Sequence, residues 1–255
     1  NIIYKVYRYF IYIIFKNKIL KSTISNSKKF ELIYKLNYWG DKSSVSGTGS
    51  SLKKTKKIRQ ELKKIIQDYK IKSILDVPCG DFNWMKEFLN SKNPPKYIGG
   101  DIVVDLINDL KKKYSTNDID FLFIDIINSN LPKADLLICR DCFIHFSNKD
   151  IKQTLNNFLN SNINYILVSD SIISKNFENY DIKTGEFRKL DLTIEPFNLP
   201  KNNLAIFNDV FNDKQNSYET KMTLWHRNQI KKWGPWAPLK IFNLQSTLSE
   251  IKSTA

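Results

Sequence analysis

Glycine, proline and cysteine are scarce in this sequence of 255 residues. It has eight glycines, eight prolines and three cysteines, while 42% of its residues are hydrophobic and 26% are charged. This composition excludes a collagen-like chain, a disordered tail, a coiled coil and a small disulfide-stapled domain. The cysteines, Cys79, Cys139 and Cys142, are odd in number and form no CxxC…CxxC pair. We therefore expect a reducing compartment, the cytoplasm.

Long uncharged hydrophobic runs are missing from the N-terminal segment. In residues 1–20 the longest such run is Tyr9–Phe15, whereas a membrane span needs about 20 apolar residues. A signal-peptide cleavage pattern is not present either. Aromatic side chains and isoleucines alternate with basic side chains here. We expect this segment either to lie as a helix on an anionic membrane surface or to pack its aromatic face on the main domain.

Acidic residues are scarce in the first third of the chain. Residues 1–72 hold 18 basic and 4 acidic side chains, and residues 73–255 hold 22 of each, so the formal net charge of +14 belongs to the first third. A segregated positive region indicates an acidic partner, which is an anionic membrane, nucleic acid or a charged substrate. A general abundance of lysine is the alternative explanation.

From Ser73 onward, short apolar segments alternate with helix-like segments. The predicted strands are 73–77, 96–102, 120–126, 134–139 and 164–170, and the predicted helices between them are 84–90, 106–114 and 150–159. This alternation predicts a parallel sheet with helices on both faces. Two further apolar runs, 204–211 and 219–227, have no helix between them and predict an antiparallel hairpin at one end of the sheet.

We divide the chain into four segments. Residues 1–36 are a basic, aromatic N-terminal extension, 37–72 a Gly/Ser-rich loop and a leading helix, 73–230 the α/β domain, and 231–255 a C-terminal tail. The loop Trp39–Ser50 is expected to close as a lid over a ligand or to be a plain linker. An amphipathic helix is predicted over 52–69, with Ser50 or Ser51 as its cap.

Each of the five predicted parallel strands ends in an aspartate. These are Asp76, Asp101, Asp125, Asp141 and Asp170. Ligands of open α/β sheets bind beyond the carboxyl ends of the strands, and acidic residues avoid the interior, so the row indicates a ligand site. Asp101 follows Asp76 by 25 residues, close to the spacing of about 20 at which an acid meets the ribose hydroxyls of a nucleotide.

The turn after the first strand lacks the G-x-G-x-x-G pattern that binds pyrophosphate. It reads PCGDF, with Gly80 as its single glycine and Asp81 as an added carboxylate. A carboxylate there repels pyrophosphate but suits a nucleoside that ends in an amino acid, such as S-adenosylmethionine (SAM). NAD, FAD and ATP are therefore not expected.

Four segments in order, LDVPCGD, GGDI, FIDI and DLLICRDCFIH, resemble the motifs of class I SAM-dependent methyltransferases. The stretch Trp39–Ser50 resembles one found in bacterial methyltransferases of surface-glycan gene sets. The resemblance implies SAM as cofactor. It also implies an α/β fold with a seven-stranded, mostly parallel, doubly wound sheet of order 3-2-1-4-5-7-6, its last strand antiparallel, helices on both faces and an N-terminal helical extension.

The resemblance also implies roles for individual residues. The cofactor residues are Asp76, Cys79 and Gly80 at the methionine end, Asp101 at the ribose, Asp125 and Ile126 at the adenine, and Arg140 beneath the sulfonium. The turn departs from the family pattern because Pro78 stands where a glycine is usual. Asp125 has a plainer alternative as an ordinary strand-end acid.

Methyl transfer to a hydroxyl needs a base, and the chain has only two histidines. His145 follows the fourth strand and is the expected base, with Asp141 as its catalytic partner; the alternative is a packing role or a bond to Asp141. In metal-dependent O-methyltransferases, acids at the positions of Asp141 and Asp170 hold a cation. A third ligand is not evident here, so no metal is expected.

Two residues are candidates for substrate binding. Trp39 offers an aromatic face, and Arg188 either holds an anionic or sugar substrate or pairs with Glu186 or Asp191. Other aromatic residues that a sugar can stack on are Phe187, Phe197, Trp233 and Trp236.

Three functions follow from these features. The first is an O-methyltransferase acting on a hydroxyl of a sugar or other small polar acceptor, with peripheral membrane association through residues 1–20. The second is an RNA methyltransferase that uses the basic N-terminal region; a [ND]-P-P-[YF] motif for base methylation is not present after the fourth strand, where CRDCF stands, so nucleic acid is the less favoured partner. The third is a non-catalytic methyltransferase-like module at the membrane.

Overall fold

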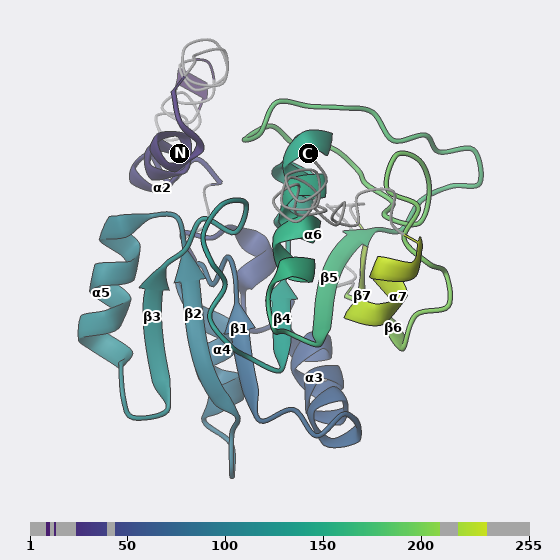
Figure 1. Ribbon diagram of the computed structural model, residues 1–255. Helices are drawn as coiled ribbons and strands as arrows, with labels where there is room; N and C mark the ends of the chain where they lie inside the picture. Colours follow the sequence, from purple (N-terminus) through teal and green to yellow (C-terminus); the bar gives the residue numbers. More distant parts are fainter. Residues whose placement is uncertain (1–8, 11–12, 14–23, 40–43, 210–218, 234–255) are drawn as a thin grey trace, which may run out of the picture.

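One mixed sheet organises the chain. The computed structural model describes residues 9–10, 13, 24–39, 44–209 and 219–233. Within these residues seven strands pair in the order β3-β2-β1-β4-β5-β7-β6 (Figure 1). They are β1 (Ser73–Asp76), β2 (Lys96–Asp101), β3 (Ile119–Phe123), β4 (Leu136–Cys139), β5 (Tyr165–Ser171), β6 (Ala205–Asn208) and β7 (Thr220–His226). β1 to β5 pair in parallel, and β7 is antiparallel to both of its neighbours. The predicted order and the antiparallel strand are confirmed.

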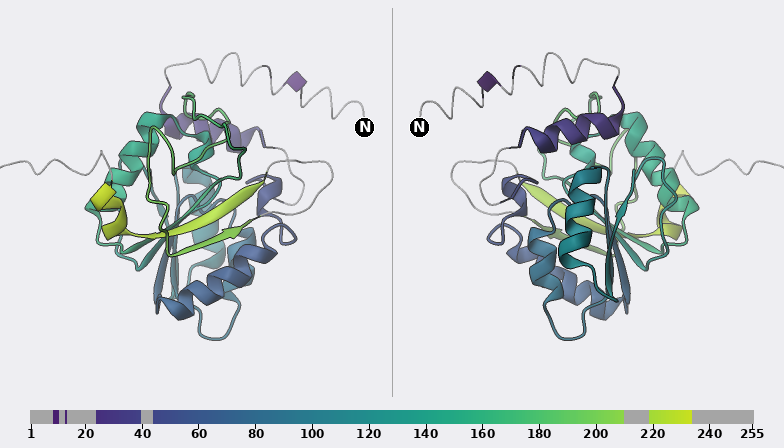
Figure 2. Two further views of the ribbon diagram at one scale, coloured as in Figure 1. Left: turned by 90° about the vertical axis from the view of Figure 1, so that its right-hand side faces the viewer. Right: turned by 90° about the vertical axis from the view of Figure 1, so that its left-hand side faces the viewer.

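Helices cover both faces of this sheet (Figure 2). The helices of the described residues are α2 (Asn26–Lys35), α3 (Lys56–Asp68), α4 (Asn83–Leu89), α5 (Val104–Tyr114), α6 (Asn148–Asn160) and α7 (Arg227–Trp233), and all but α2 pack beside the sheet. Helices α3, α4 and α5 pack in one core cluster, and α6 with residues 190–199 packs in the other. The strands divide between the two clusters by alternation: Ile74 faces the first and Leu75 the second, as the two-residue period of a strand requires.

Some predicted boundaries were wrong, each for a local reason. β3 ends at Phe123 rather than at residue 126, because the chain turns at Asp125, whose carbonyl accepts the N–H groups of Asn128 (3.0 Å) and Ser129 (2.7 Å). α3 begins at Lys56 rather than Leu52. Ser51 does not cap α3: its hydroxyl accepts the Lys54 N–H (3.4 Å) and closes a separate turn ahead of the helix.

Part of the predicted hairpin and of the N-terminal segment lies outside the described residues. This holds for 210–218, for 1–8, 11–12 and 14–23, for 40–43 in the lid loop, and for 234–255 in the predicted tail. α2 is described, and Ser25 caps it by accepting the Lys28 N–H (3.3 Å). It lies across the edge of the sheet where the parallel strands end (Figure 2). Among the helices in the described ranges, none has the length and apolarity that a membrane crossing requires.

Trp225 tests the packing on the α6 side of the sheet. Its side chain is fully buried and its Nε1–H donates to the Pro200 carbonyl (2.8 Å). Trp225→Ala should lower the free energy of unfolding by about 3–5 kcal/mol, since it leaves a large cavity. Trp225→Phe keeps most of the ring, so it should cost only about 1–3 kcal/mol for the unpaired carbonyl. Urea denaturation measures both; equal losses would show that the hydrogen bond, and not the packing, dominates at this position.

Candidate active site

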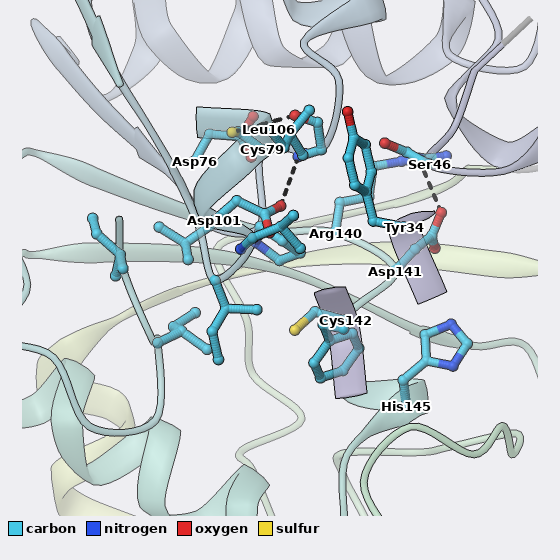
Figure 3. Close-up of a pocket in the computed structure, with 18 of the residues that line it drawn as sticks. Tyr34, Ser46, Asp76, Cys79, Asp101, Leu106, Arg140, Asp141, Cys142 and His145 are labelled. Atoms are coloured by element: carbon cyan, nitrogen blue, oxygen red, sulfur yellow. Dashed lines mark hydrogen bonds and ion pairs between the residues drawn. The ribbon is translucent and has the colours of Figure 1, made fainter. Parts of the chain in front are cut away.

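A single cavity gathers the residues that the sequence singled out. Its empty volume, solvent at the mouth included, is about 1060 Å³, and it opens at the carboxyl ends of β1, β2 and β4 (Figure 3). The predicted residues that line it are Asp76, Cys79, Gly80, Asp101, Asp125, Ile126, Arg140, Asp141, His145 and Trp39. Except for Trp39 and His145, they lie at or just after the ends of strands that are distant in sequence, and the parallel sheet places these ends on one edge.

Asp101 fixes the turn after β1. It is 6% exposed, its Oδ2 accepts the Gly80 N–H (3.2 Å) and its Oδ1 accepts the Val103 N–H (3.1 Å). Burial raises the pKa of Asp101 to about 6, against the opposing effect of these N–H groups. Gly80 has a φ of +54°, and a Cβ there would collide with the hydroxyl of Ser46. The turn therefore requires glycine.

Asp76 lies deeper, at the end of β1. It is 2% exposed, and one carboxylate oxygen accepts a hydrogen bond from the Tyr97 hydroxyl (2.9 Å). Burial raises the pKa of Asp76 to about 7, although Tyr97 and Arg140 both favour its charged form. Two neighbouring buried carboxyls thus resist ionisation, and a cation bound beside them would relieve that cost.

Asp125 and Ile126 follow β3 in a tight turn. The Asp125 carboxylate accepts the Ile127 N–H (3.0 Å) and the Asn128 side-chain amide (2.8 Å). Ile126 is buried and lines the cavity. Further apolar side chains of this part of the wall are Ile102, Val103, Leu106, Ile124 and Ile127. The combination of an apolar wall with one carboxylate suits a flat ring that carries an amino group.

Arg140 is held by three groups. Its Nε donates to Asp209 Oδ2 (2.7 Å), its Nη1 pairs with Asp141 Oδ2 (2.9 Å), and its Nη2 donates to the Gly49 carbonyl (3.2 Å). Burial alone would lower the pKa of Arg140, but Asp141 and Asp209 outweigh it and raise the pKa above its ordinary value. The guanidinium is therefore bound within the protein, and the partner Asp209 was missed because it follows β6, far away in the sequence.

His145 closes a short 3₁₀ helix, η3 (Phe143–His145), after β4. Its Nδ1 lies 2.8 Å from the Glu186 carbonyl oxygen. A carbonyl can only accept, so we assign the proton to Nδ1, which leaves the lone pair on Nε2. Burial lowers the pKa of His145, while the charge of Asp141 acts in the opposite direction. The imidazole is neutral at pH 7 and can accept a proton.

The loop from Ser44 to Ser50 covers the cavity and is tied to the first turn. Asp81 Oδ2 accepts the Val45 N–H (3.2 Å), and the Asp81 N–H donates to the Ser46 hydroxyl (2.9 Å). Val45, Ser46 and Ser50 line the cavity. Asp81 is not among the lining residues, so its carboxylate holds the loop instead of facing a ligand.

Helix α2 was missing from the residues expected at the site, yet it covers the cavity with Asn26, Phe30 and Tyr34. The helix is docked by polar contacts: Lys29 Nζ donates to the Thr184 carbonyl (3.2 Å), and the Asn26 amide donates to Asp150 (3.3 Å). Two aromatic residues four positions apart, behind a serine cap, are the sequence signal that could have identified it.

Some expected residues do not reach the cavity. Arg188 is fully buried, and it donates to the Phe146 carbonyl (2.6 Å) and to Asn148 Oδ1 (3.0 Å), so the expected pairing with Glu186 or Asp191 is wrong. A substrate in the cavity cannot touch its guanidinium, so the expected substrate role of Arg188 is corrected. Phe197 lies in the core; Trp236 and the side chain of Trp233 fall outside the described residues.

Asp170, the last of the strand-end aspartates, is also turned away from the cavity. Its side chain faces Lys221 Nζ (3.5 Å) and accepts the Leu192 N–H (3.2 Å). In the ranges that the structure describes, no three His, Cys, Asp or Glu side chains gather where they could hold a metal ion.

The fold occurs in solved methyltransferase structures. Magnesium protoporphyrin IX methyltransferase from Synechocystis PCC 6803 with bound SAM matches with a TM-score of 0.52 at 12% identity, over 81% of this chain and 99% of that chain. The same enzyme with bound SAH gives 0.51 at 12% identity, over 79% and 95%. Human N-acetylserotonin methyltransferase in complex with SAM gives 0.46 at 12%, over 84% and 66%.

The sequence matches no known protein-family profile and no curated protein. The structural similarity to the Synechocystis enzyme therefore establishes the fold, which is the class I methyltransferase fold. At this level of sequence identity the fold alone is shared.

The raised pKa values of the buried carboxyls predict a pH-dependent stability. Asp76, with a pKa of about 7 in the folded protein, keeps a proton that the unfolded chain loses near pH 4. Stability that this proton provides is therefore full below about pH 4, falls as pH rises from about 4 to about 7, and is gone above about 7. Asp76→Asn removes the effect and can still accept from Tyr97.

Thermal unfolding of the ligand-free wild type and of Asp76→Asn at pH 4 and pH 8 measures this. The two proteins should unfold at similar temperatures at pH 4, and Asp76→Asn should be more stable at pH 8 by on the order of 1–3 kcal/mol, about 2–12 °C at this size. Titrating groups that do not interact with Asp76, His145 and His226 among them, are common to both proteins and cancel in the difference. A difference that does not change with pH would contradict the assignment.

Proposed function

We propose that this protein is a SAM-dependent methyltransferase that methylates a hydroxyl of a sugar or another small polar acceptor. One observation carries the proposal: a single cavity joins buried strand-end carboxyls to a neutral histidine whose Nε2 keeps its lone pair. The fold that the chain shares with the Synechocystis methyltransferase supports it.

The charges of the lining residues fit this cofactor. Four aspartates face the cavity, and Arg140 is the one lysine or arginine among the described lining residues. Arg140 is already paired with Asp141 and Asp209. SAM carries a positive sulfonium and a positive ammonium group, which buried carboxylates stabilise. A pyrophosphate cofactor would meet uncompensated negative charge at the same place.

Each part of the cofactor has a matching set of residues. Each carboxylate oxygen of Asp101 accepts one backbone N–H and keeps a further lone pair, so Asp101 would accept hydrogen bonds from the ribose hydroxyls. Asp125 with the apolar wall around Ile126 would hold the adenine ring. Asp76 and the Cys79–Gly80 turn would hold the methionine end. In this proposal Arg140 does not bind the cofactor itself but holds Asp141 and the Gly49 carbonyl of the lid loop in place around it.

The chain's own residues would provide the acid–base chemistry. When bound, SAM supplies a methyl group on a sulfonium leaving group, which keeps the bonding electron pair. His145 Nε2 would take the proton from the acceptor hydroxyl as the oxygen forms its bond to the methyl carbon. The Glu186 carbonyl holds the imidazole in the required tautomer, and Asp141 stabilises the imidazolium that forms. The lid loop and α2 limit the access of water.

The acceptor side of the cavity favours an uncharged ring. Phe30, Trp39 and Phe146 line it, and the Trp39 and His145 rings lie 5.3 Å apart between centroids. Aromatic faces bind the apolar face of a sugar, while the excess of carboxylates disfavours phosphorylated acceptors. A nucleic-acid acceptor is therefore the less favoured partner.

The cellular setting is also part of the proposal. Cys79, Cys139 and Cys142 are free and buried, which supports a cytoplasmic location. Peripheral contact of residues 1–20 with an anionic membrane is supported by the charge of the segment and by Tyr9 and Phe10, which are 64% and 60% exposed.

Cofactor binding is tested by Asp101→Asn. We expect the wild-type protein to be stabilised by SAH at 100 times its dissociation constant by about 2.7 kcal/mol, a rise of about 5–11 °C in unfolding temperature. NAD and ATP should give no rise. In Asp101→Asn the affinity for SAH should fall by about 10- to 100-fold, because hydrogen bonds from the ribose to a charged group are lost.

The matched control is Asp118→Asn, which removes an acid with a 65% exposed side chain. It should bind SAH like the wild type. The cofactor assignment fails if SAH does not stabilise the wild-type protein, and the ribose role of Asp101 fails if both variants bind equally well.

The base is tested by His145→Asn, whose amide can still donate toward the Glu186 carbonyl but has no counterpart of Nε2. Turnover should fall by roughly 10²–10⁴-fold, with unchanged affinity for SAH. In the wild type, kcat should rise with pH through a pKa below the ordinary 6.5 of histidine, because only the neutral ring accepts a proton. A variant with near-normal turnover would reduce His145 to a packing role.

A further inference from the structure

Phe187 is an exposed aromatic residue beside the proposed base. Its side chain is 53% exposed, and its ring centroid lies 5.8 Å from that of His145. The Trp39 ring centroid lies 5.3 Å from that of His145 as well. His145 therefore contacts one aromatic ring that lines the cavity, Trp39, and one that is not among the lining residues, Phe187.

The backbone that carries Phe187 is firmly held. The Gly185 N–H donates to the His145 carbonyl (2.8 Å), the Arg188 N–H donates to the Ile144 carbonyl (3.0 Å), and the Glu186 carbonyl accepts from His145 Nδ1 (2.8 Å). Gly185 has a φ of +104°, a conformation that allows the tight turn before Phe187.

Arg188 explains why the loop stays in place. Its guanidinium is fully buried and bonds to the Phe146 carbonyl and to Asn148. Thr184, at the other side of Phe187, is 5% exposed and is bonded to Asp150. Thr184 and Arg188 thus anchor the backbone on both sides of Phe187, so its exposed ring is pre-organised for binding and little entropy is lost when a ligand covers it.

We propose that Phe187 forms an outer acceptor subsite, which binds the second ring of a glycoside or oligosaccharide whose first ring lies against Trp39 beside His145. The inference rests on the proposed function and deepens it, because it names an acceptor of at least two rings. The occupant is a ring with an apolar face, either a second sugar or an aromatic group attached to the first sugar. Phe187 is a specificity residue that the reaction itself does not require.

The test compares acceptors of one and two rings. The probes are methyl, phenyl and methyl-disaccharide glycosides in the glucose, galactose and mannose series. Saturation-transfer NMR on protein saturated with SAH reports which ring contacts the protein. In separate samples without SAH, methyl transfer from SAM gives kcat and KM. The phenyl and disaccharide arms distinguish an aromatic second ring from a sugar.

Phe187→Ala should abolish saturation transfer to the second ring and raise KM for two-ring acceptors by about 3- to 10-fold, which corresponds to the loss of one stacking contact. The KM for the methyl glycoside and kcat for all acceptors should not change. Phe187→Trp should keep the contact. The matched control is Phe123→Ala at the end of β3, where the phenylalanine is 49% exposed, and it should leave every value unchanged.

Three results would overturn the subsite. The first is equal saturation transfer to the second ring in Phe187→Ala and in the wild type. The second is a rise in KM in Phe187→Ala that is equal for one-ring and two-ring acceptors. The third is that no glycoside binds to the SAH-loaded wild type. Failure of the proposed function itself is distinguished in the same samples by the SAH thermal shift. A protein that SAH stabilises but that does not discriminate between the rings loses the subsite alone.

Discussion

The buried guanidinium of Arg140 joins three parts of the chain that are distant in sequence. It pairs with Asp141 after β4, with Asp209 after β6, and with the carbonyl of Gly49 in the lid loop. A buried cation without partners is very costly, so the native fold requires all three contacts together. The lid loop and the β6–β7 hairpin are thereby fixed relative to the strand ends at which the cavity opens.

The cavity contains two buried carboxyl groups that are costly to ionise. Asp76 and Asp101 are buried next to each other, and the pKa of each is raised well above that of a free aspartate. A protein optimised for stability alone would replace them with neutral side chains. Their presence is understandable if a cationic ligand completes the site, because the same burial that penalises the ionised carboxyls in the free protein strengthens their attraction to a bound cation.

The two sides of the cavity have different origins. The side proposed for the cofactor is built from the ends of the parallel strands, which the α/β fold brings together in any sequence that adopts it. The acceptor side comes from α2 and from residues 184–188, which dock on the core through polar contacts such as Lys29 with Thr184. A common core with variable additions is how one fold serves many acceptors, and for that reason the fold supports the cofactor more strongly than the acceptor.

The sequence by itself determined the parallel sheet and the row of strand-end residues, because these depend on local periodicity and on what ends each strand. The strand order was implied by the resemblance of four of its segments to the motifs of class I methyltransferases. Only the tertiary structure decided which of these residues face the cavity. Asp170 and Arg188 point away from it, Asp81 holds the lid loop, and α2 supplies Phe30 and Tyr34. Such choices depend on contacts between residues far apart in the chain, like Arg140 with Asp209, and no local pattern records them.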